Sequence, residues 1–193
     1  MRFTNISTIS SHPDEETIAP ASPLEMLLGC HARIRHFVQL SRTLAGAEGA
    51  APLEVAEAAT AIFRYFSYAL PLHQADESDT LFPRLQNALP QGGLVREAAD
   101  AMIEQHKAID ELVAELLSIC TSLTHHPESL PSLERRFEYV TCALEQVFAA
   151  HLRLEETVIF PALSDLLTPA QMDEMAREIN QRRRPKLTIH FPQ

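Results

Sequence analysis

The chain has 193 residues, of which 46% are hydrophobic, and its formal net charge at pH 7 is -10. This length suits one well-buried domain and is short for two. The acidic balance argues against nucleic acid or an anionic membrane as a partner. No apolar run reaches the roughly 18 residues of a membrane span, and the N-terminal stretch lacks a signal-peptide core, so we expect a cytoplasmic protein.

The first predicted helix follows an N-terminal segment, residues 1–21, whose scattered Pro and Ser residues predict disorder. Residues 22–25 read Ser-Pro-Leu-Glu, which combines an N-cap serine, a proline at the first helical position and a glutamate three residues on. This helix is expected to run to about Leu44. A second helix begins near Pro52 and runs towards Phe82, and Pro71 should kink or bulge it.

The second half of the chain repeats this organisation. A connection containing Pro90 leads to a third helix from about residue 94 to residue 123, and a fourth spans about residues 130–166. Residues 168–171, Thr-Pro-Ala-Gln, are a second capping signature that opens a short helix to about Arg182. The basic cluster at residues 182–186 is interpreted as a solvated tail. The prediction is therefore an all-α chain with an up-down-up-down four-helix bundle at residues 22–167, followed by a short helix and a basic tail at residues 168–193.

An internal repeat relates the second helix to the fourth. Residues 73–85 and 151–163 both read His-x-x-x-Glu-x-x-x-[Leu/Ile]-Phe-Pro-x-Leu, at the constant offset 151 − 73 = 78. The first and third helices show a weaker echo around His31 and His106, at the offset 106 − 31 = 75. The first helix pair therefore resembles the second pair. This two-fold organisation allows four histidines, one from each helix, to meet in the middle of the bundle.

The spacing within the repeat favours a metal site. Residues four apart share one face of a helix, so each His-x-x-x-Glu block forms a patch of two ligands. A lone helical histidine is usually an ordinary core or surface residue, but packing alone does not require a glutamate at the same place twice. Four imidazoles and two carboxylates suit two divalent ions about 3.5–4 Å apart, and imidazole accepts iron, zinc, copper or nickel. The candidate ligands are His31, His73, Glu77, His106, His151 and Glu155.

The carboxylates, the cysteines and the Phe-Pro pairs around these ligands give further expectations. Without a cation, burying two carboxylates together would be costly and would raise at least one of their pKa values. Cys30 precedes His31, but helix neighbours point about 100° apart, so the thiol is not expected to contact the metal. Cys30, Cys120 and Cys142 lack CxxC spacing and are interpreted as buried thiols. The Phe82-Pro83 and Phe160-Pro161 pairs are expected to pack and to end their helices.

The blocks PLHQADESDTLFP and HLRLEETVIFP resemble the signature of the hemerythrin-like, HHE cation-binding family over residues 22–167. The resemblance implies a four-helix bundle with a non-haem di-iron centre, in which an oxide or hydroxide can also bridge the two iron ions. It implies that His31, His73, His106 and His151 are terminal ligands and that Glu77 and Glu155 are bridging carboxylates.

Two positions differ from the oxygen-carrying members of that family. Asp110 stands where their third helix has a further histidine, and we interpret it as solvent-facing or as a residue behind the ligands. Their fourth-helix acid lies five residues after the histidine, which would select Glu156. The repeat selects Glu155 instead, because about 400° of rotation keeps it nearer the face of His151 than about 500° would. The pattern is closer to the four-His, two-Glu sites of the iron–sulfur-repair and iron-sensing branches.

The favoured function is a binding or sensing module and not an enzyme. Six protein ligands cannot fill two octahedra, so oxygen, nitric oxide or peroxide could bind at the open positions. Alternatives are iron handling, a di-iron enzyme of the peroxidase, oxidase, nitric oxide reductase or iron–sulfur-repair type, and a helical interaction domain without metal. The last leaves the repeated His-Glu blocks unexplained.

Overall fold

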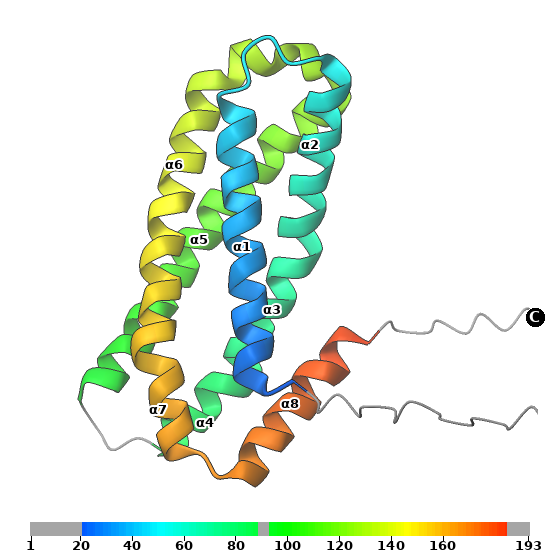
Figure 1. Ribbon diagram of the computed structural model, residues 1–193. Helices are drawn as coiled ribbons and strands as arrows, with labels where there is room; N and C mark the ends of the chain where they lie inside the picture. The colour runs from blue at the N-terminus through cyan, green and yellow to red at the C-terminus, as the bar shows by residue number, and fades with distance from the viewer. Residues whose placement is uncertain (1–20, 89–92, 185–193) are drawn as a thin grey trace, which may run out of the picture.

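The computed structural model describes residues 21–88 and 93–184, which form an all-helical bundle (Figure 1). Nearly all of the N-terminal segment predicted to be disordered, together with Pro90 and the tail from residue 185, lies outside the described residues. In the described ranges the chain has no β-strand. None of the helices in these ranges has both the length and the apolar character needed to cross a membrane.

The helices follow the predicted order. The bounds are α1 Pro23–Ala45, α2 Pro52–Arg64, η1 Tyr65–Ala69, α3 Leu70–Asp76, η2 Glu77–Leu81, α4 Phe82–Ala88, α5 Leu94–His125, η3 Pro127–Ser129, α6 Leu130–Leu154, η4 Glu155–Ile159, α7 Phe160–Leu166 and α8 Pro169–Arg183. Elements η1, η2 and η4 are π-helical turns, and η3 is a single 3-10 turn. The segments α2 to α4 and α6 to α7 each form one continuous helix that the π-helical turns interrupt.

Both predicted capping boxes are confirmed. The Ser22 side chain accepts the backbone N–H of Glu25, and the Glu25 carboxylate accepts the N–H of Ser22. Thr168 and Gln171 form the same pair of bonds at the start of α8. These bonds satisfy N–H groups that have no partner within the helix, and they fix where α1 and α8 begin.

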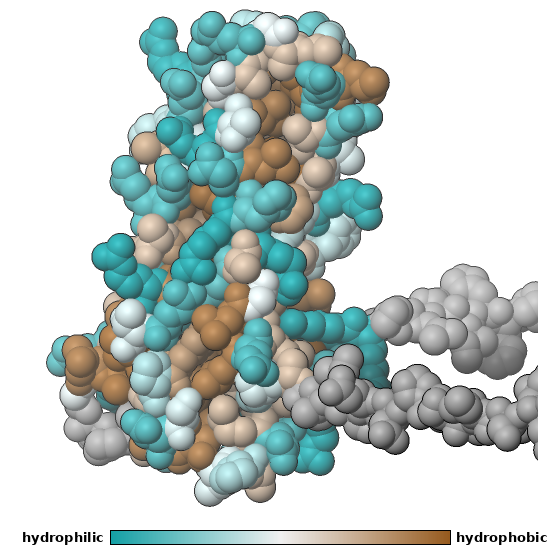
Figure 2. Space-filling view, in the orientation of Figure 1, coloured by the Kyte–Doolittle hydropathy of each residue, from teal (hydrophilic) through white to brown (hydrophobic). Residues whose placement is uncertain are grey.

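The long helices pack side by side. Helix α1 contacts α2 and α6, and α5 contacts the same two helices. Helix α8 crosses the end of the bundle and contacts α1, α3 and η2 (Figure 1). Hydrophilic residues cover much of the face in Figure 2, and hydrophobic groups show between them.

The core consists of two hydrophobic clusters with a polar layer between them. Along α1, Leu27 belongs to one cluster and Ile34 to the other. Along α5, Met102 and Ile109 are divided in the same way. His31 and His106 lie between these pairs in the sequence, so the layer that separates the clusters is the one that carries the predicted ligands.

Candidate metal centre

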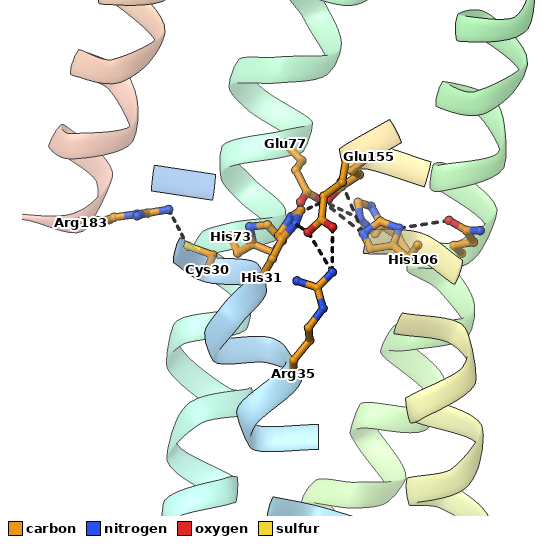
Figure 3. Close-up of polar contacts among 11 residues, drawn as sticks. Cys30, His31, Arg35, His73, Glu77, His106, Glu155 and Arg183 are labelled. Atoms are coloured by element: carbon orange, nitrogen blue, oxygen red, sulfur yellow. Dashed lines mark hydrogen bonds and ion pairs between the residues drawn. The ribbon is translucent and has the colours of Figure 1, made fainter. Parts of the chain in front are cut away.

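The structure brings together all six side chains that the sequence predicts as ligands. Figure 3 labels all of them except His151. They come from all the long helical segments of the bundle: His31 from α1, His73 and Glu77 from α3 and η2, His106 from α5, and His151 and Glu155 from α6 and η4. Five of the six are at most 2% exposed, and His106 is half-buried.

The donor atoms form two groups that share Glu77. Those of His31, His73, Glu77 and Glu155 lie within 4.8 Å of one another, as do those of Glu77, His106 and His151.

Each carboxylate also faces one histidine of each group. The Glu77 oxygens lie 2.7 Å from His73 Nε2 and 2.8 Å from His106 Nε2. The Glu155 oxygens lie 2.7 Å from His31 Nε2 and 3.6 Å from His151 Nε2. Each carboxylate therefore lies between a histidine of one group and a histidine of the other.

The inward-facing atoms of this cluster lack hydrogen-bond partners. Both carboxylate oxygens of Glu77 and of Glu155 are buried without a hydrogen bond, as are the Nε2 atoms of His31, His73 and His106. Buried polar atoms in proteins are nearly always satisfied, and leaving one unpaired costs roughly 1–3 kcal/mol. A set of unpaired imidazole nitrogens and carboxylate oxygens is the donor set for divalent transition metals. The cluster is therefore able to hold metal cations.

Proline residues place the two glutamates. Glu77 and Glu155 each begin a π-helical turn, in which their carbonyls accept the N–H groups of Phe82 and Phe160. Pro83 and Pro161 come next; a proline cannot donate to the carbonyl four residues back, and its ring collides with that carbonyl. The wider π-helical turn relieves this clash, and such turns often occur at functional sites.

The prediction that the Phe-Pro pairs end their helices is wrong. Helices α4 and α7 continue past the prolines to Ala88 and Leu166, because the π-helical turns accommodate a proline that cannot donate a backbone hydrogen bond. Phe82 and Phe160 are buried, as expected. The predicted distortion before Pro71 is confirmed and takes the same form, the π-helical turn η1.

The charges in the cluster oppose one another when no cation is present. Burial raises the pKa of Glu155, and the negative charge of Glu77 raises it further, to well above its ordinary value. Burial alone would also raise the pKa of Glu77, but the charges of His73 and His151 and the close approach of His106 Nε2 hold it well below its ordinary value. The expectation that one carboxyl pKa rises is confirmed.

The pKa values of two of the histidines are also shifted in opposite directions. Burial alone would lower the pKa of His73, but the carboxylate of Glu77 raises it well above its ordinary value. Burial lowers the pKa of His151 to about 4.

Polar side chains behind the histidines orient two of the four rings. Glu156 accepts a hydrogen bond from His31 Nδ1 at 2.8 Å and also pairs with Arg35. Gln105 lies 3.1 Å from His151 Nδ1. These contacts turn the Nε2 atoms towards the carboxylates, as partners behind metal-binding histidines usually do.

Cys30 lies behind a third ring, that of His73. Burial alone would raise the pKa of its thiol, but the nearby His73 and the charges of Arg183 and Arg33 lower it. Cys30 lies outside both donor groups, as the sequence predicts. Of the other two thiols, Cys120 is buried and Cys142 is half-buried.

Two further acidic residues near the predicted ligands, Glu156 and Asp110, lie outside the donor groups. Glu156 supports His31 and is partly exposed, whereas Glu155 faces the other ligands. Asp110 is exposed and accepts a hydrogen bond from Gln74.

The basic cluster at residues 182–186 is not simply a solvated tail. Arg182 and Arg183 belong to α8 and form ion pairs with the fully buried Asp76. The sequence patterns do not predict a structural role for Asp76. The signal for it is that the repeat puts Leu154 at the equivalent position, because 76 + 78 = 154.

Comparison with known proteins agrees with this geometry. The family model described as the hemerythrin HHE cation-binding domain matches residues 22–119 and again residues 97–184. A protein of Haemophilus influenzae described as uncharacterized is 27% identical over 172 residues, which cover 85% of this chain and 91% of that protein. The family match spans most of the bundle and includes all six clustered residues. The chain therefore belongs to the hemerythrin HHE cation-binding domain family.

Proposed function

We propose that the chain holds a two-metal centre, most simply a di-iron centre, and uses it to bind or sense oxygen, nitric oxide or peroxide. The observation that carries this proposal is the set of buried imidazole nitrogens and carboxylate oxygens that face one another without hydrogen-bond partners. The proposal includes the up-down-up-down order of the four long helical segments, which is supported by the packing of α1 and α5 against both α2 and α6.

The donor groups suggest how the protein divides its ligands between two ions. His31, His73, Glu77 and Glu155 would hold one ion, and His106 and His151 would hold the other together with Glu77. The second ion would have fewer close protein donors, and His106 is the ligand nearest to solvent. We therefore place the small exogenous ligand on the His106 side. A bound iron pair would supply reversible redox chemistry there, while the protein would supply the site and its access.

Metal content tests the centre directly. The chain is reconstituted anaerobically with ferrous iron, freed of excess metal, and analysed for iron per chain. We expect about two irons per chain, with a sharp loss in Glu77→Ala. Asp110→Asn is the matched control, because Asp110 is an exposed acid one helical turn after His106, and it should retain full iron content. A wild-type chain that keeps no metal would refute the proposal.

The use of the centre is tested on the iron-loaded protein. Stoichiometric nitric oxide, oxygen or peroxide should change its optical spectrum, and a spectrum that none of them alters would rule out binding at the iron. Repeated consumption of peroxide or nitric oxide in large excess over protein would identify a catalyst instead of a binding module.

A further inference from the structure

Helix α8 contacts the turn that carries Glu77. Asp76 precedes Glu77, is fully buried, and pairs with both Arg182 and Arg183. Arg182 also donates to Thr80 Oγ1 at 3.2 Å, and Thr80 lies inside the π-helical turn η2. The two arginines therefore contact residues on both sides of Glu77.

A second contact reaches the other ligands of the same group. Arg183 donates to Cys30 Sγ at 3.1 Å (Figure 3). Cys30 directly precedes His31, and its side chain lies beside His73 (Figure 3). One arginine of α8 thus touches the neighbours of three of the four residues in the first donor group.

The internal repeat shows that these polar contacts are particular to the first half of the chain. The positions equivalent to Asp76 and Thr80 are Leu154 and Val158, because 76 + 78 = 154 and 80 + 78 = 158. Both are apolar and pack on a hydrophobic cluster beside Glu155. A π-helical turn with a ligand glutamate therefore forms without a buried acid, so Asp76 is not needed to make the turn.

Other contacts already hold α8 in place. Met175 and Ile179 are fully buried, and Arg84 of α4 pairs with Glu178. Docking alone would not need a carboxylate beside Glu77. Asp76 is held in one orientation by its two arginine partners, because turning it away would leave a buried charge unpaired, which is very costly.

We propose that α8 positions the Glu77 turn through Asp76 and Cys30, so that docking of α8 and metal binding stabilise each other. This inference rests on the proposed metal centre. Coupling of this kind is reciprocal: if α8 strengthens metal binding, bound metal must strengthen the docking of α8 by the same factor.

The test measures both directions of this coupling on the full chain. Iron affinity is measured anaerobically by competition with a chelator, and backbone amide hydrogen exchange of α8 is measured with and without iron. In the wild type, iron should slow exchange in α8. The Asp76→Leu variant copies the residue of the second half and leaves no unpaired buried acid. It should bind iron about 10-fold more weakly and should lose the iron-dependent slowing in α8.

Met175→Ala is the matched control, because it removes a fully buried apolar contact of α8 and takes no part in the polar contacts to Asp76, Thr80 and Cys30. Its α8 should exchange faster overall but should still be slowed by iron, and its iron affinity should stay near that of the wild type. If Asp76→Leu fails to fold, the wild-type exchange decides alone, and equal exchange of α8 with and without iron overturns the coupling. A wild type that takes up no iron rejects the metal centre and the coupling together. If the wild type binds iron and the Asp76→Leu variant shows the same iron affinity and the same iron-dependent exchange in α8, only the coupling is rejected.

Discussion

The two buried glutamates carry opposite pKa shifts although they occupy equivalent positions of the repeat. Glu155 lies beside the ionised Glu77, whose negative charge opposes ionisation of Glu155. This conflict belongs to the protein without a cation. Two divalent ions would favour the ionised form of both carboxyls, which is a reason for the pair to exist at all.

Metal binding should therefore release protons. Glu155 and His73 both have raised pKa values, so each holds its proton to a higher pH than a free side chain does. Both must lose that proton to donate to a metal. Iron affinity should rise as the pH rises past about 6.5, the ordinary pKa of histidine, and fall as the pH falls, with protons released on loading. Chelator competition on both sides of this pH and an indicator dye in weak buffer measure the two effects; an affinity independent of pH contradicts the assignment.

Glu156 is predicted to tune the centre without binding metal. Glu156→Gln removes the charge that accepts from His31 Nδ1, and it should weaken iron binding by about 10-fold while leaving two irons at saturation. Glu145→Gln is the matched control, since Glu145 pairs with Arg42 across neighbouring helices, as Glu156 does with Arg35. An unchanged affinity in Glu156→Gln, or an equal loss in the control, would show that the contact does not act on the metal.

At this scale the sequence predicts the residues that face inward but not those behind them. The spacing of His73 and Glu77, which His151 and Glu155 repeat, places each pair on one helix face. The partners Glu156, Gln105 and Cys30 come mostly from neighbouring helices, and helical periodicity within one segment says nothing about contacts between segments. In the weaker repeat Gln105 occupies the position equivalent to Cys30, because 30 + 75 = 105. A carboxamide and a thiol differ in chemistry, so the repeat does not predict a shared role.

At the scale of the helix, the π-helical turns before Pro83 and Pro161 are the feature that the sequence patterns did not predict. A proline inside a helical pattern is compatible with an end, a kink or a bulge. Each Phe-Pro pair is followed by a buried leucine, Leu85 or Leu163, so the chain gains more by continuing the helix than by stopping it. The choice depends on burial after the proline, which is a tertiary effect. Helix existence, capping and approximate bounds, in contrast, were all predictable from local residues.

Replacing Pro83 tests whether the turn serves the metal. Pro83→Ala restores an N–H and removes the ring, so a regular α-helix can form, and Glu77 should rotate away from the histidines. We expect iron binding to weaken by about 10-fold or more while the metal-free protein becomes about 1 kcal/mol more stable. Pro131→Ala is the control, because Pro131 lies in the first turn of α6. Chelator competition and urea unfolding give the two quantities; a variant that kept full affinity would make the turn irrelevant to the site.

At the scale of the whole molecule, the ligand layer interrupts an otherwise hydrophobic core. Leu27 and Ile34 on α1, and Met102 and Ile109 on α5, show that apolar packing resumes on both sides of it. The all-helical bundle is predictable because each helix carries its own apolar stripe. The position of α8 is not predictable, since it depends on contacts with α1, α3 and η2, which lie far from α8 along the chain.

The layer of predicted ligands should lower the stability of the metal-free fold, and we expect its carboxylates to be needed for metal binding. In Glu77→Leu/Glu155→Leu, two buried carboxyls give way to apolar groups of similar size, which is often neutral or stabilising by about 1–4 kcal/mol. We expect this metal-free double variant to unfold at higher urea than the metal-free wild type. Iron should stabilise the wild type, by about 2.7 kcal/mol at free iron about 100 times the dissociation constant, and should not stabilise the variant. A less stable variant would mean that the glutamates hold the fold together themselves. A gain in stability together with the loss of the iron effect would mean that the bundle keeps them for the metals.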